Sequence, residues 1–158
     1  MIRTARPDDA TAIAAIWNPI IADTSITFTT QPKTETGVKA VIAERGAAFV
    51  VAERAGTLLG FATWGPFRSG PGYAASAEHT IHLAPAARRQ GIGRALMQAL
   101  EDRARAAGVH VLVGGISAEN ADAIAFHATL GYAETARMPE VGRKFGRWLD
   151  LVLVQKIL

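Results

Sequence analysis

A pair of glycines at the start of a long amphipathic segment limits the folds open to this chain more than any other feature. Gly91 and Gly93 lie in the run RRQGIGRAL, after a β-branched stretch and a prolyl loop. From Gln90 to Ala107 apolar residues recur at helical spacing, and Gly108 then stands where helices usually end. Glycine lets a chain turn sharply from a strand into a helix. The order of strand, glycine turn and helix therefore predicts a protein of the α/β class.

Two well-known phosphate-binding turns do not fit this glycine pair. A dinucleotide-binding turn requires a third glycine where Leu96 stands and an acidic residue about 20 residues further on, where the chain reads HVLVGG. A P-loop requires Gly-Lys-Ser/Thr, which is absent. What remains is a helix N-terminus, whose backbone N–H groups and dipole favour an anion. Arg88, Arg89 and Arg94 add positive charge there, so we expect the turn to hold a pyrophosphate.

Strand and helix patterns alternate along the rest of the chain. Strands are expected at residues 2–5, 47–54, 57–65, 76–83 and 109–117 and in two later segments, the last at 148–156. Further helices are expected to begin at Asp8 or Asp9, at Glu35 and after Asn120, and Pro19 should bend or end the first of them. This order predicts a mixed sheet with helices on both faces, folded as a single domain over residues 1–158.

Composition narrows the functional classes. The chain has 49% hydrophobic and 20% charged residues, as ordinary globular proteins have, and no cysteine. It therefore has no thiolate site, and its 4 histidines show no metal-binding spacing, so we expect no metal. The net charge of +3 comes with interleaved basic and acidic residues, which argues against nucleic-acid binding. No apolar run suits a membrane span or a signal peptide, so we expect a cytoplasmic protein that binds no membrane.

Three segments, in order, resemble one known family. RRQGIGRAL is similar to the R/Q-x-x-G-x-G/A acetyl-CoA signature of the GNAT superfamily of N-acetyltransferases, with Arg88, Gly91 and Gly93 at the matching positions. AEHTIHLAPAARRQGIG, NADAIAFHATLGY and MPEVGRKFGRWLDL together resemble the subgroup that acetylates phosphinothricin and methionine sulfoximine or sulfone, over nearly the whole chain. The resemblance implies a GNAT fold, with a central mixed, mostly antiparallel sheet, and acetyl-CoA as cosubstrate.

The resemblance also implies direct acetyl transfer to an amine, for which Glu78 is the expected general base. Amino groups are mostly protonated at neutral pH, and a carboxylate beside the substrate, directly or through water, can accept the proton. Alternation along a strand places Glu78 and Thr80 on one face and His79 and Ile81 on the other. The alternative is a solvated glutamate on an edge strand.

Many GNAT enzymes carry a tyrosine in the helix after Asn120 as the acid for the leaving thiolate. The resembled subgroup and this chain have a histidine there, in FHATLGY, so His127 is the expected acid. The alternative is a partly buried histidine with a structural hydrogen bond, because a thiolate can leave without help. Asn120 is expected to cap its own helix, to bind the pantetheine arm, or to do both.

The expected acetyl-CoA site joins a strand edge to the glycine turn. The resemblance implies that backbone N–H groups around Ile81 to Leu83 meet the thioester and the pantetheine arm, where a bulge splays two strands. The residues expected to bind acetyl-CoA are Ile81, His82, Leu83, Arg88, Arg89, Gln90, Gly91, Ile92, Gly93, Arg94 and Asn120.

The loop GPFRSGPGYA is expected beside the acceptor amine. Arg68 in this loop can clamp a carboxylate with its planar guanidinium, or can simply face solvent. Relatives carry an aromatic and a basic residue just before the glutamate, whereas this chain has Ala74 and Ala75, which favours a smaller or differently charged acceptor. The residues expected to bind the acceptor are Phe28, Arg68, Ser69, Tyr73, Glu78, His79 and Thr80.

Three functions are therefore open. The first is acetylation of the α-amino group of a small amino-acid-like compound such as phosphinothricin, methionine sulfoximine or methionine sulfone, as a detoxifying step. The second is the same transfer to a protein N-terminus or a polyamine, and the third is a non-catalytic module that senses coenzyme A. The resemblance further implies a homodimer with the pocket near the interface, toward which Lys144, Phe145 and Gly146 would reach.

Overall fold

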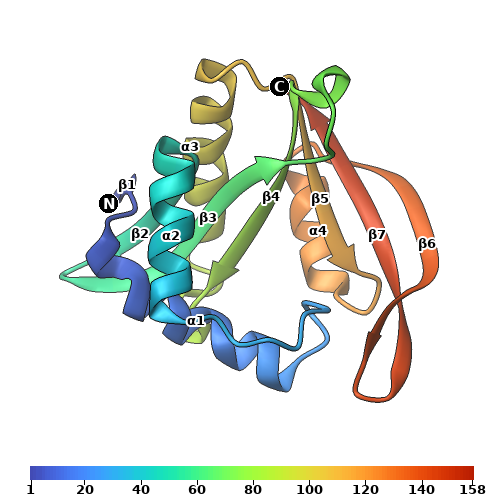
Figure 1. The fold of residues 1–158 in the computed structure, drawn as a ribbon, viewed down its shortest axis with the longest axis horizontal. Helices are drawn as coiled ribbons and strands as arrows, with labels where there is room; N and C mark the ends of the chain where they lie inside the picture. Colours follow the sequence, from blue (N-terminus) through green and yellow to red (C-terminus); the bar gives the residue numbers. More distant parts are fainter.

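Seven strands form one sheet in the order β1-β2-β3-β4-β5-β7-β6 in a computed structural model that describes residues 1–158 (Figure 1). Every neighbouring pair is antiparallel except β4 and β5, which are parallel. The predicted mixed, mostly antiparallel sheet is confirmed. The strands are β1 (Ile2–Thr4), β2 (Phe49–Arg54), β3 (Thr57–Pro66), β4 (Ser76–Leu83), β5 (Val111–Ser117), β6 (Ala133–Lys144) and β7 (Arg147–Ile157).

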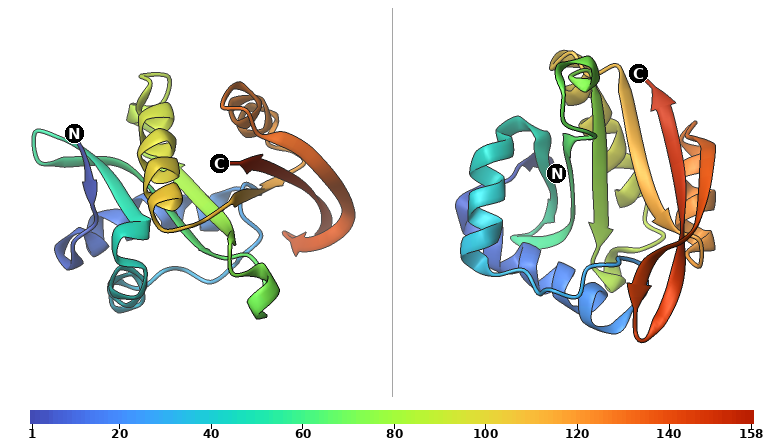
Figure 2. Two further views of the ribbon diagram at one scale, coloured as in Figure 1. Left: turned by 90° about the horizontal axis from the view of Figure 1, so that it is seen from above. Right: turned by 45° about the vertical axis from the view of Figure 1, so that its right-hand side comes forward.

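Helices cover both faces of this sheet, as the order of elements predicted. α1 and α2 lie on one face, and α3 and α4 lie on the other (Figure 2). The helices are α1 (Ala10–Asp23), α2 (Glu35–Arg45), α3 (Ile92–Ala106) and α4 (Ala121–Thr129).

Alternate residues of the central strands point into separate cores on the two faces. Phe49, Val51 and Phe61 belong to the core under α1 and α2. Val50 and Ala62, next to them in sequence, belong to the core under α3 and α4. This alternation follows from the period of two along a β-strand, and it explains why these strands are apolar on both faces.

The larger core lies beneath α3. Leu96, Met97 and Leu100 of this helix are fully buried, and burying each side chain contributes roughly 1.5–3 kcal/mol. The amphipathic pattern seen from Gln90 onward is thus confirmed as a helix, which begins at Ile92.

Pro19 does not end the first helix, which continues to Asp23. A proline inside a helix removes one backbone hydrogen bond and costs roughly 3 kcal/mol. Ile20 and Ile21 directly after it are buried, and their burial offsets this cost. The expectation that the helix could end at this proline is therefore wrong.

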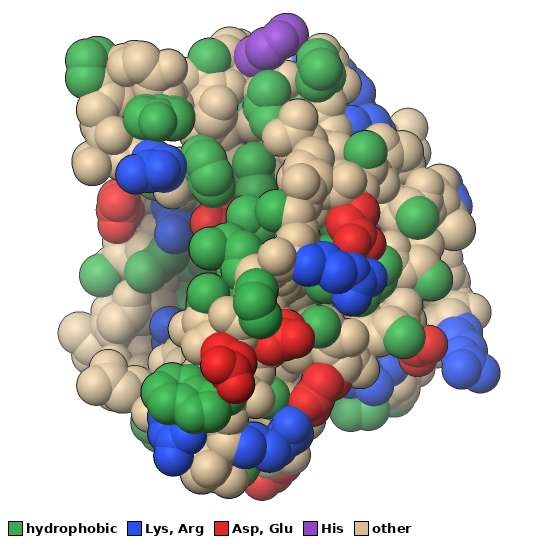
Figure 3. All heavy atoms as spheres, turned by 90° about the vertical axis from the view of Figure 1, so that its right-hand side faces the viewer, with side chains coloured by type: hydrophobic (Ala, Val, Ile, Leu, Met, Phe, Trp, Pro, Cys, Tyr) green, Lys and Arg blue, Asp and Glu red, His purple; other side chains and the backbone are tan.

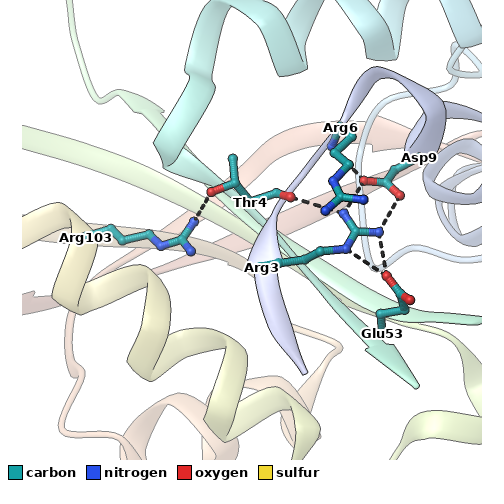
Figure 4. Close-up of polar contacts among 6 residues, drawn as sticks. All are labelled: Arg3, Thr4, Arg6, Asp9, Glu53 and Arg103. Atoms are coloured by element: carbon teal, nitrogen blue, oxygen red, sulfur yellow. Dashed lines mark hydrogen bonds and ion pairs between the residues drawn. The ribbon is translucent and has the colours of Figure 1, made fainter. Parts of the chain in front are cut away.

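A partly buried ion-pair cluster joins the first strand to the start of the first helix and to β2 (Figure 4). The Arg3 guanidinium donates hydrogen bonds of 2.7 and 2.8 Å to Asp9 and one of 2.7 Å to Glu53. Asp9 also accepts a hydrogen bond of 2.7 Å from the backbone N–H of Arg6. The hydrogen bonds from Arg3 are the main reason why the pKa of Asp9 is lowered.

β4 and β5 separate part-way along their length, and this separation positions the site (Figure 1). Their parallel pairing runs only from Ser76 opposite Val111 to His79 opposite Gly114. β3 stays paired with β4 as far as Leu83 without a shift in register. The splay therefore arises without a bulge in β4, contrary to the expected cause.

Candidate active site

A cavity of about 980 Å³ opens where β4 and β5 separate. The start of α3, one face of α4 and the connection between α1 and α2 complete its walls. The structure brings these predicted site residues to the cavity: Phe28, Glu78, His79, Thr80, Ile81, His82, Leu83, Arg88, Arg89, Gly91, Gly93, Arg94, Asn120 and His127. The predicted residues outside its lining are Arg68, Ser69, Tyr73, Gln90 and Ile92.

One end of the cavity is cationic. Arg88, Arg89 and Arg94 line it, and none of the three forms an ion pair with a carboxylate of the chain. The N-terminus of α3 lies at the same place, and no side chain caps it. Free N–H groups, a helix dipole and three unpaired guanidinium groups make this end suitable for a pyrophosphate.

Glycine is required at positions 91 and 93 for two different structural reasons. Gly91 precedes α3 with a backbone φ of 77°, a left-handed conformation that strains other residues. Gly93 lies inside the helix, where a Cβ atom would come within 3.2 Å of the Phe126 ring. Gly91 therefore makes the turn, and Gly93 lets α3 approach α4.

Two residues of the turn face away from the cavity. The Gln90 side chain donates to the backbone oxygen of Ala86 at 2.6 Å and accepts from Arg54 at 3.1 Å. Ile92 is buried in the core under α3. Both side chains hold the turn in shape, so any contact of these residues with acetyl-CoA would come from their backbone.

The edge of β4 that faces β5 has no strand partner beyond His79. Backbone groups between Thr80 and Leu83 on this edge are open to an extended ligand, as at any unpaired sheet edge. A pantetheine arm carries amide groups that can pair with such an edge. The strand edge and the cationic end together fit the shape and charge of coenzyme A.

Glu78 lines the cavity from β4. A Cβ atom on Gly115 would come within 3.1 Å of the Glu78 carboxylate, which shows how closely β5 passes it. The carboxylate has no hydrogen-bond or ion-pair partner, and partial burial raises its pKa. A carboxylate without a partner and with a raised pKa is suited to accept a proton from a substrate.

Side chains on β4 alternate as predicted. His82 packs against Trp17 and, edge to face, against Phe61 on the α1 side of the sheet, with ring centroids 5.7 and 5.6 Å away. Burial lowers the pKa of His82 to about 4, so its imidazole is a neutral wall of the cavity. His79 points to the opposite face, where its ring centroid lies 5.3 Å from that of Tyr132.

His79 and His127, which both line the cavity, contact each other. Their Nε2 atoms are 2.9 Å apart, and the two side chains are 6% and 4% exposed. Burial lowers the pKa of His127, and the pKa of His79 falls to about 3. The sequence assigned the two residues separate roles and carried no signal for this contact, because 48 residues separate them.

Asn120 caps α4, which was one of the two roles expected for it. Its side-chain oxygen accepts a hydrogen bond of 3.1 Å from the backbone N–H of Ala123. The residue also lines the cavity, which leaves its amide nitrogen available for the second expected role, a contact with pantetheine.

The other end of the cavity is apolar. Ile20, Ile26, Phe28 and Leu151 line it together with Thr27, whose buried hydroxyl has no hydrogen-bond partner. Of these residues only Phe28 was expected from the sequence. The others come from α1, its following connection and β7, and their sequence surroundings show no pattern beyond that of core residues.

A buried lysine holds this apolar wall in place. The ammonium of Lys144, at the end of β6, donates to the backbone oxygens of Thr24 at 2.6 Å and Thr27 at 2.8 Å. Burial lowers its pKa. Lys144 thus binds its own chain, rather than reaching toward a partner as expected.

An ion pair supports the same connection from the other side. Arg147 at the start of β7 donates a hydrogen bond of 2.8 Å to Glu119, which accepts another of 3.1 Å from Ser25. Three segments distant in sequence therefore meet beside the cavity-lining residues Ile26 and Asn120. They are the α1–α2 connection, the β5–α4 connection and the β6–β7 hairpin.

The loop between β3 and β4 lies outside the cavity lining. Its Arg68 guanidinium lies over the ring of Tyr73, 5.4 Å from the ring centroid, and Ser69 stands beside it in the same exposed loop. A role for these three residues in acceptor binding stays a prediction, because it requires the loop to move toward Glu78.

Comparison with known proteins decides the family. Residues 16–132 match the model described as the acetyltransferase (GNAT) family. The chain belongs to this family. The matched segment contains both the glycine turn and the strand that carries Glu78.

Relatives named for an acetyltransferase activity match nearly the whole chain. It is 38% identical over 157 residues to the L-methionine sulfoximine/L-methionine sulfone acetyltransferase of Salmonella typhimurium, covering 98% of this chain and 92% of that protein. It is 33% identical over 161 residues to the phosphinothricin N-acetyltransferase of Alcaligenes faecalis, covering 99% and 82%. The structure of yncA from Salmonella typhimurium, solved with its cofactor acetyl-CoA, has a TM-score of 0.96 at 38% identity, covering 100% of this chain and 93% of that one.

Several predictions from the sequence are confirmed by these findings. The chain has the GNAT fold, it is a GNAT N-acetyltransferase, and family membership supports acetyl-CoA as its cosubstrate. The resemblance to the methionine sulfoximine/sulfone and phosphinothricin acetyltransferases is confirmed as well. None of its helices has the length and apolar character needed to cross a membrane.

Proposed function

We propose that this chain acetylates the α-amino group of a small amino-acid-like compound by direct transfer from acetyl-CoA, as a single domain over residues 1–158. The observation that carries the proposal is the unpaired carboxylate of Glu78, which lines the same cavity as the cationic turn and the apolar side chains. The named activities of the relatives favour phosphinothricin, methionine sulfoximine or methionine sulfone as the acceptor.

The cationic end would hold the donor. Arg88, Arg89, Arg94 and the N-terminus of α3 would bind the pyrophosphate, and the unpaired edge of β4 would bind the pantetheine arm. Bound acetyl-CoA supplies the acetyl group as a thioester. The role of the chain at this end is to orient the donor along β4, with its thioester beside Glu78.

Glu78 would prepare the acceptor. An α-amino group arrives largely as ammonium and cannot attack while it is protonated. Glu78, directly or through one water, takes a proton from it, and the raised pKa of this carboxyl makes it a stronger base than a fully solvated glutamate. The adjacent Thr80 lines the same wall and would orient the amine.

His127 would supply the proton that the leaving sulfur needs. It lies on α4, which closes the cavity opposite β4, and the amide of Asn120 at the start of the same helix can hold the pantetheine arm. A general acid in this position contributes typically about 10²-fold or more when the leaving group is basic.

The apolar end would select the acceptor. Ile20, Ile26, Phe28 and Leu151 favour an uncharged side chain, as in methionine sulfone or sulfoximine, over the anionic phosphinate of phosphinothricin. The unpartnered hydroxyl of Thr27 offers one hydrogen bond, which suits an oxygen such as that of a sulfone or sulfoximine.

We also propose that the chain forms a homodimer through the β6–β7 hairpin. Met138, Val141, Phe145 and Trp148 are large apolar side chains that the hairpin leaves exposed. Apolar side chains are visible on the face that the hairpin forms (Figure 3). Sedimentation of the wild type and of Trp148→Asp tests this, and a monomeric wild type at micromolar concentration would contradict it.

An acetyl-transfer assay tests the function. Release of coenzyme A thiol is measured with acetyl-CoA and a panel of phosphinothricin, methionine sulfoximine, methionine sulfone, unmodified amino acids, a polyamine and a peptide N-terminus. We expect turnover with at least one amino-acid-like amine and its loss in Glu78→Gln. Turnover restricted to the polyamine or the peptide would refute the proposed acceptor class.

A further inference from the structure

The contact between His79 and His127 has an unusual proton requirement. One ring comes from β4 and the other from α4, and they meet only through their Nε2 atoms, 2.9 Å apart. Two nitrogens at this distance attract each other only if a proton lies between them. What each ring does with its other nitrogen therefore decides how many protons the pair must hold.

Both remaining nitrogens face groups that can only accept a hydrogen bond. His79 Nδ1 lies 2.8 Å from the backbone oxygen of Val113, and His127 Nδ1 lies 2.7 Å from the backbone oxygen of Ala123. A carbonyl oxygen has no proton to give, so each Nδ1 must carry one for these contacts to be hydrogen bonds.

The three contacts of the pair together need three protons. Two neutral imidazoles carry only two protons, and therefore one contact of the neutral pair has no proton. One additional proton completes all three hydrogen bonds and gives the pair a single positive charge. Because both Nδ1 atoms are already committed, this additional proton belongs between the two Nε2 atoms.

We propose that His79 and His127 exchange one proton as a unit through their Nε2 atoms, and that this pair, rather than His127 alone, is the acid of the reaction. His79 is then a positioning residue that acts through His127. This inference rests on the proposed function in so far as it assigns the pair a role in acetyl transfer.

The surroundings limit the pair to one added charge. Burial lowers the pKa of both rings, and the charge of His127 lowers that of His79 further, so two added protons would repel each other at this depth. Neither ring is hydrogen-bonded to a carboxylate. Each histidine is therefore the only titratable group that can share the proton of the other.

Other titratable groups near the pair are engaged elsewhere or face the cavity. The Tyr132 ring centroid lies 5.3 Å from those of both histidines, but its hydroxyl donates to Glu101 at 3.1 Å. Glu101 is paired in turn with Lys156 at 2.7 Å. Glu78 and Asp122 line the cavity without a hydrogen bond to either ring.

Gly114 provides the space that this arrangement needs. It lies opposite His79 in the β4–β5 register, and a Cβ atom at this position would come within 2.9 Å of Cε1 of the His79 ring. A glycine inside a buried strand costs stability and usually marks a close approach of another group. Here the group is the imidazole, whose Cε1 lies against Gly114 of β5 while its Nε2 contacts His127.

The proton balance of the step is simple. When the pair carries its added proton, the N–H bond at His127 Nε2 breaks and an S–H bond forms on the leaving sulfur, since Nδ1 of this ring is held by Ala123. The lowered pKa of both rings makes this charged pair a stronger acid than a free imidazolium. The positive charge of the pair and the negative charge of the sulfur disappear together. Before the next turnover Glu78 releases to solvent the proton that it took from the acceptor ammonium, and the neutral pair takes up one proton from solvent.

Nuclear magnetic resonance of the imidazole nitrogens tests the pair in the whole chain without acetyl-CoA. In a pH titration of ¹⁵N-labelled protein, we expect the Nε2 signals of both histidines to shift with one common midpoint. Gain of one proton in total is expected over that transition. Two independent midpoints, or an unprotonated Nδ1 on either ring in the charged state, would overturn the proposal.

Two matched variants test the catalytic consequence. His79→Asn keeps a donor near Val113 but loses the contact with His127, whereas His79→Gln places an amide near Nε2 that does not titrate. In both we expect the His127 midpoint to move by about one pH unit or more, and the pH profile of kcat to move with it. His110→Asn, on an exposed residue away from the cavity, is the control.

The outcomes separate this inference from the proposed function. Unchanged pH profiles in both His79 variants, with only a lower melting temperature, would show a structural role and overturn the inference. A common midpoint in the wild type together with no turnover of any amine would uphold the shared proton and refute the proposed function instead.

Discussion

The ammonium of Lys144 lies 2.6 Å from the backbone oxygen of Thr24, which ties the end of the β6–β7 hairpin to the connection after α1. A second hydrogen bond of 2.8 Å goes to Thr27, whose side chain lines the apolar end of the cavity. The shape of the proposed acceptor site therefore depends on a contact between residues 120 positions apart in the chain.

Replacing this lysine should loosen the acceptor site. Lys144→Met keeps the length of the side chain but leaves two backbone oxygens without a donor. We expect destabilisation of roughly 1–3 kcal/mol in urea unfolding and a rise of about tenfold in KM for the amine, with a smaller change in kcat. Lys39→Met, on an exposed lysine of α2, is the control. An unchanged KM would show that the wall holds its shape without the ammonium.

Removing the proposed base should abolish most of the activity. Glu78→Gln keeps the size of the side chain, so we expect kcat/KM to fall by about 10²-fold or more while coenzyme A binds with unchanged affinity in calorimetry. Glu44→Gln, in α2 and away from the cavity, should behave as the wild type. A full rate in Glu78→Gln would assign the base elsewhere.

The same residue should set the acidic limb of the pH profile. Burial raises the pKa of Glu78, and only the carboxylate can accept a proton, so activity is lost as the pH falls through this raised value. The acidic limb of kcat/KM should therefore lie above the ordinary glutamate pKa of about 4.3. A limb at or below that value would contradict the assignment.

Weakening the cationic end should weaken donor binding in a salt-dependent way. Arg94→Gln removes one unpaired charge at the N-terminus of α3, and we expect the Kd for coenzyme A to rise about tenfold at low salt. The difference from wild type should shrink as sodium chloride is added. Arg105→Gln, on the last turn of the same helix, should leave Kd unchanged. Equal Kd values for Arg94→Gln and wild type at low salt would count against a pyrophosphate at this turn.

The Arg3–Asp9 pair should make stability depend on acidic pH. The pKa of Asp9 is lowered in the folded protein, so its contribution is complete above the unfolded value of about 3.9 and is lost as the pH falls through the folded value. Asp9→Asn should cost roughly 1–3 kcal/mol at pH 7 in urea unfolding. The difference between variant and wild type should then decrease below about pH 4. A difference that stays constant down to pH 2 would show that the Asp9 charge is not its origin.

Much of the fold could be predicted because its signals are local. The helical spacing from Gln90 onward, the stop at Gly108 and the apolar strands on either side each reflect contacts between residues close in sequence. The glycine turn and its arginines could be predicted for the same reason, because one short run contains them all. Pro19 shows the limit, since buried isoleucines after it outweigh the local preference to end the helix.

The sequence alone determined the order of strands and helices, the glycine turn with its arginines and the carboxylate on β4. Tertiary structure alone decided that His79 meets His127, that Lys144 holds the apolar wall of the cavity, and that Arg68 lies outside the cavity. Patterns of spacing report which face of an element is buried, but not which distant element will cover it. Those pairings form only when the whole sheet assembles, and the proton count of the histidine pair follows from atoms that lie far apart in the chain.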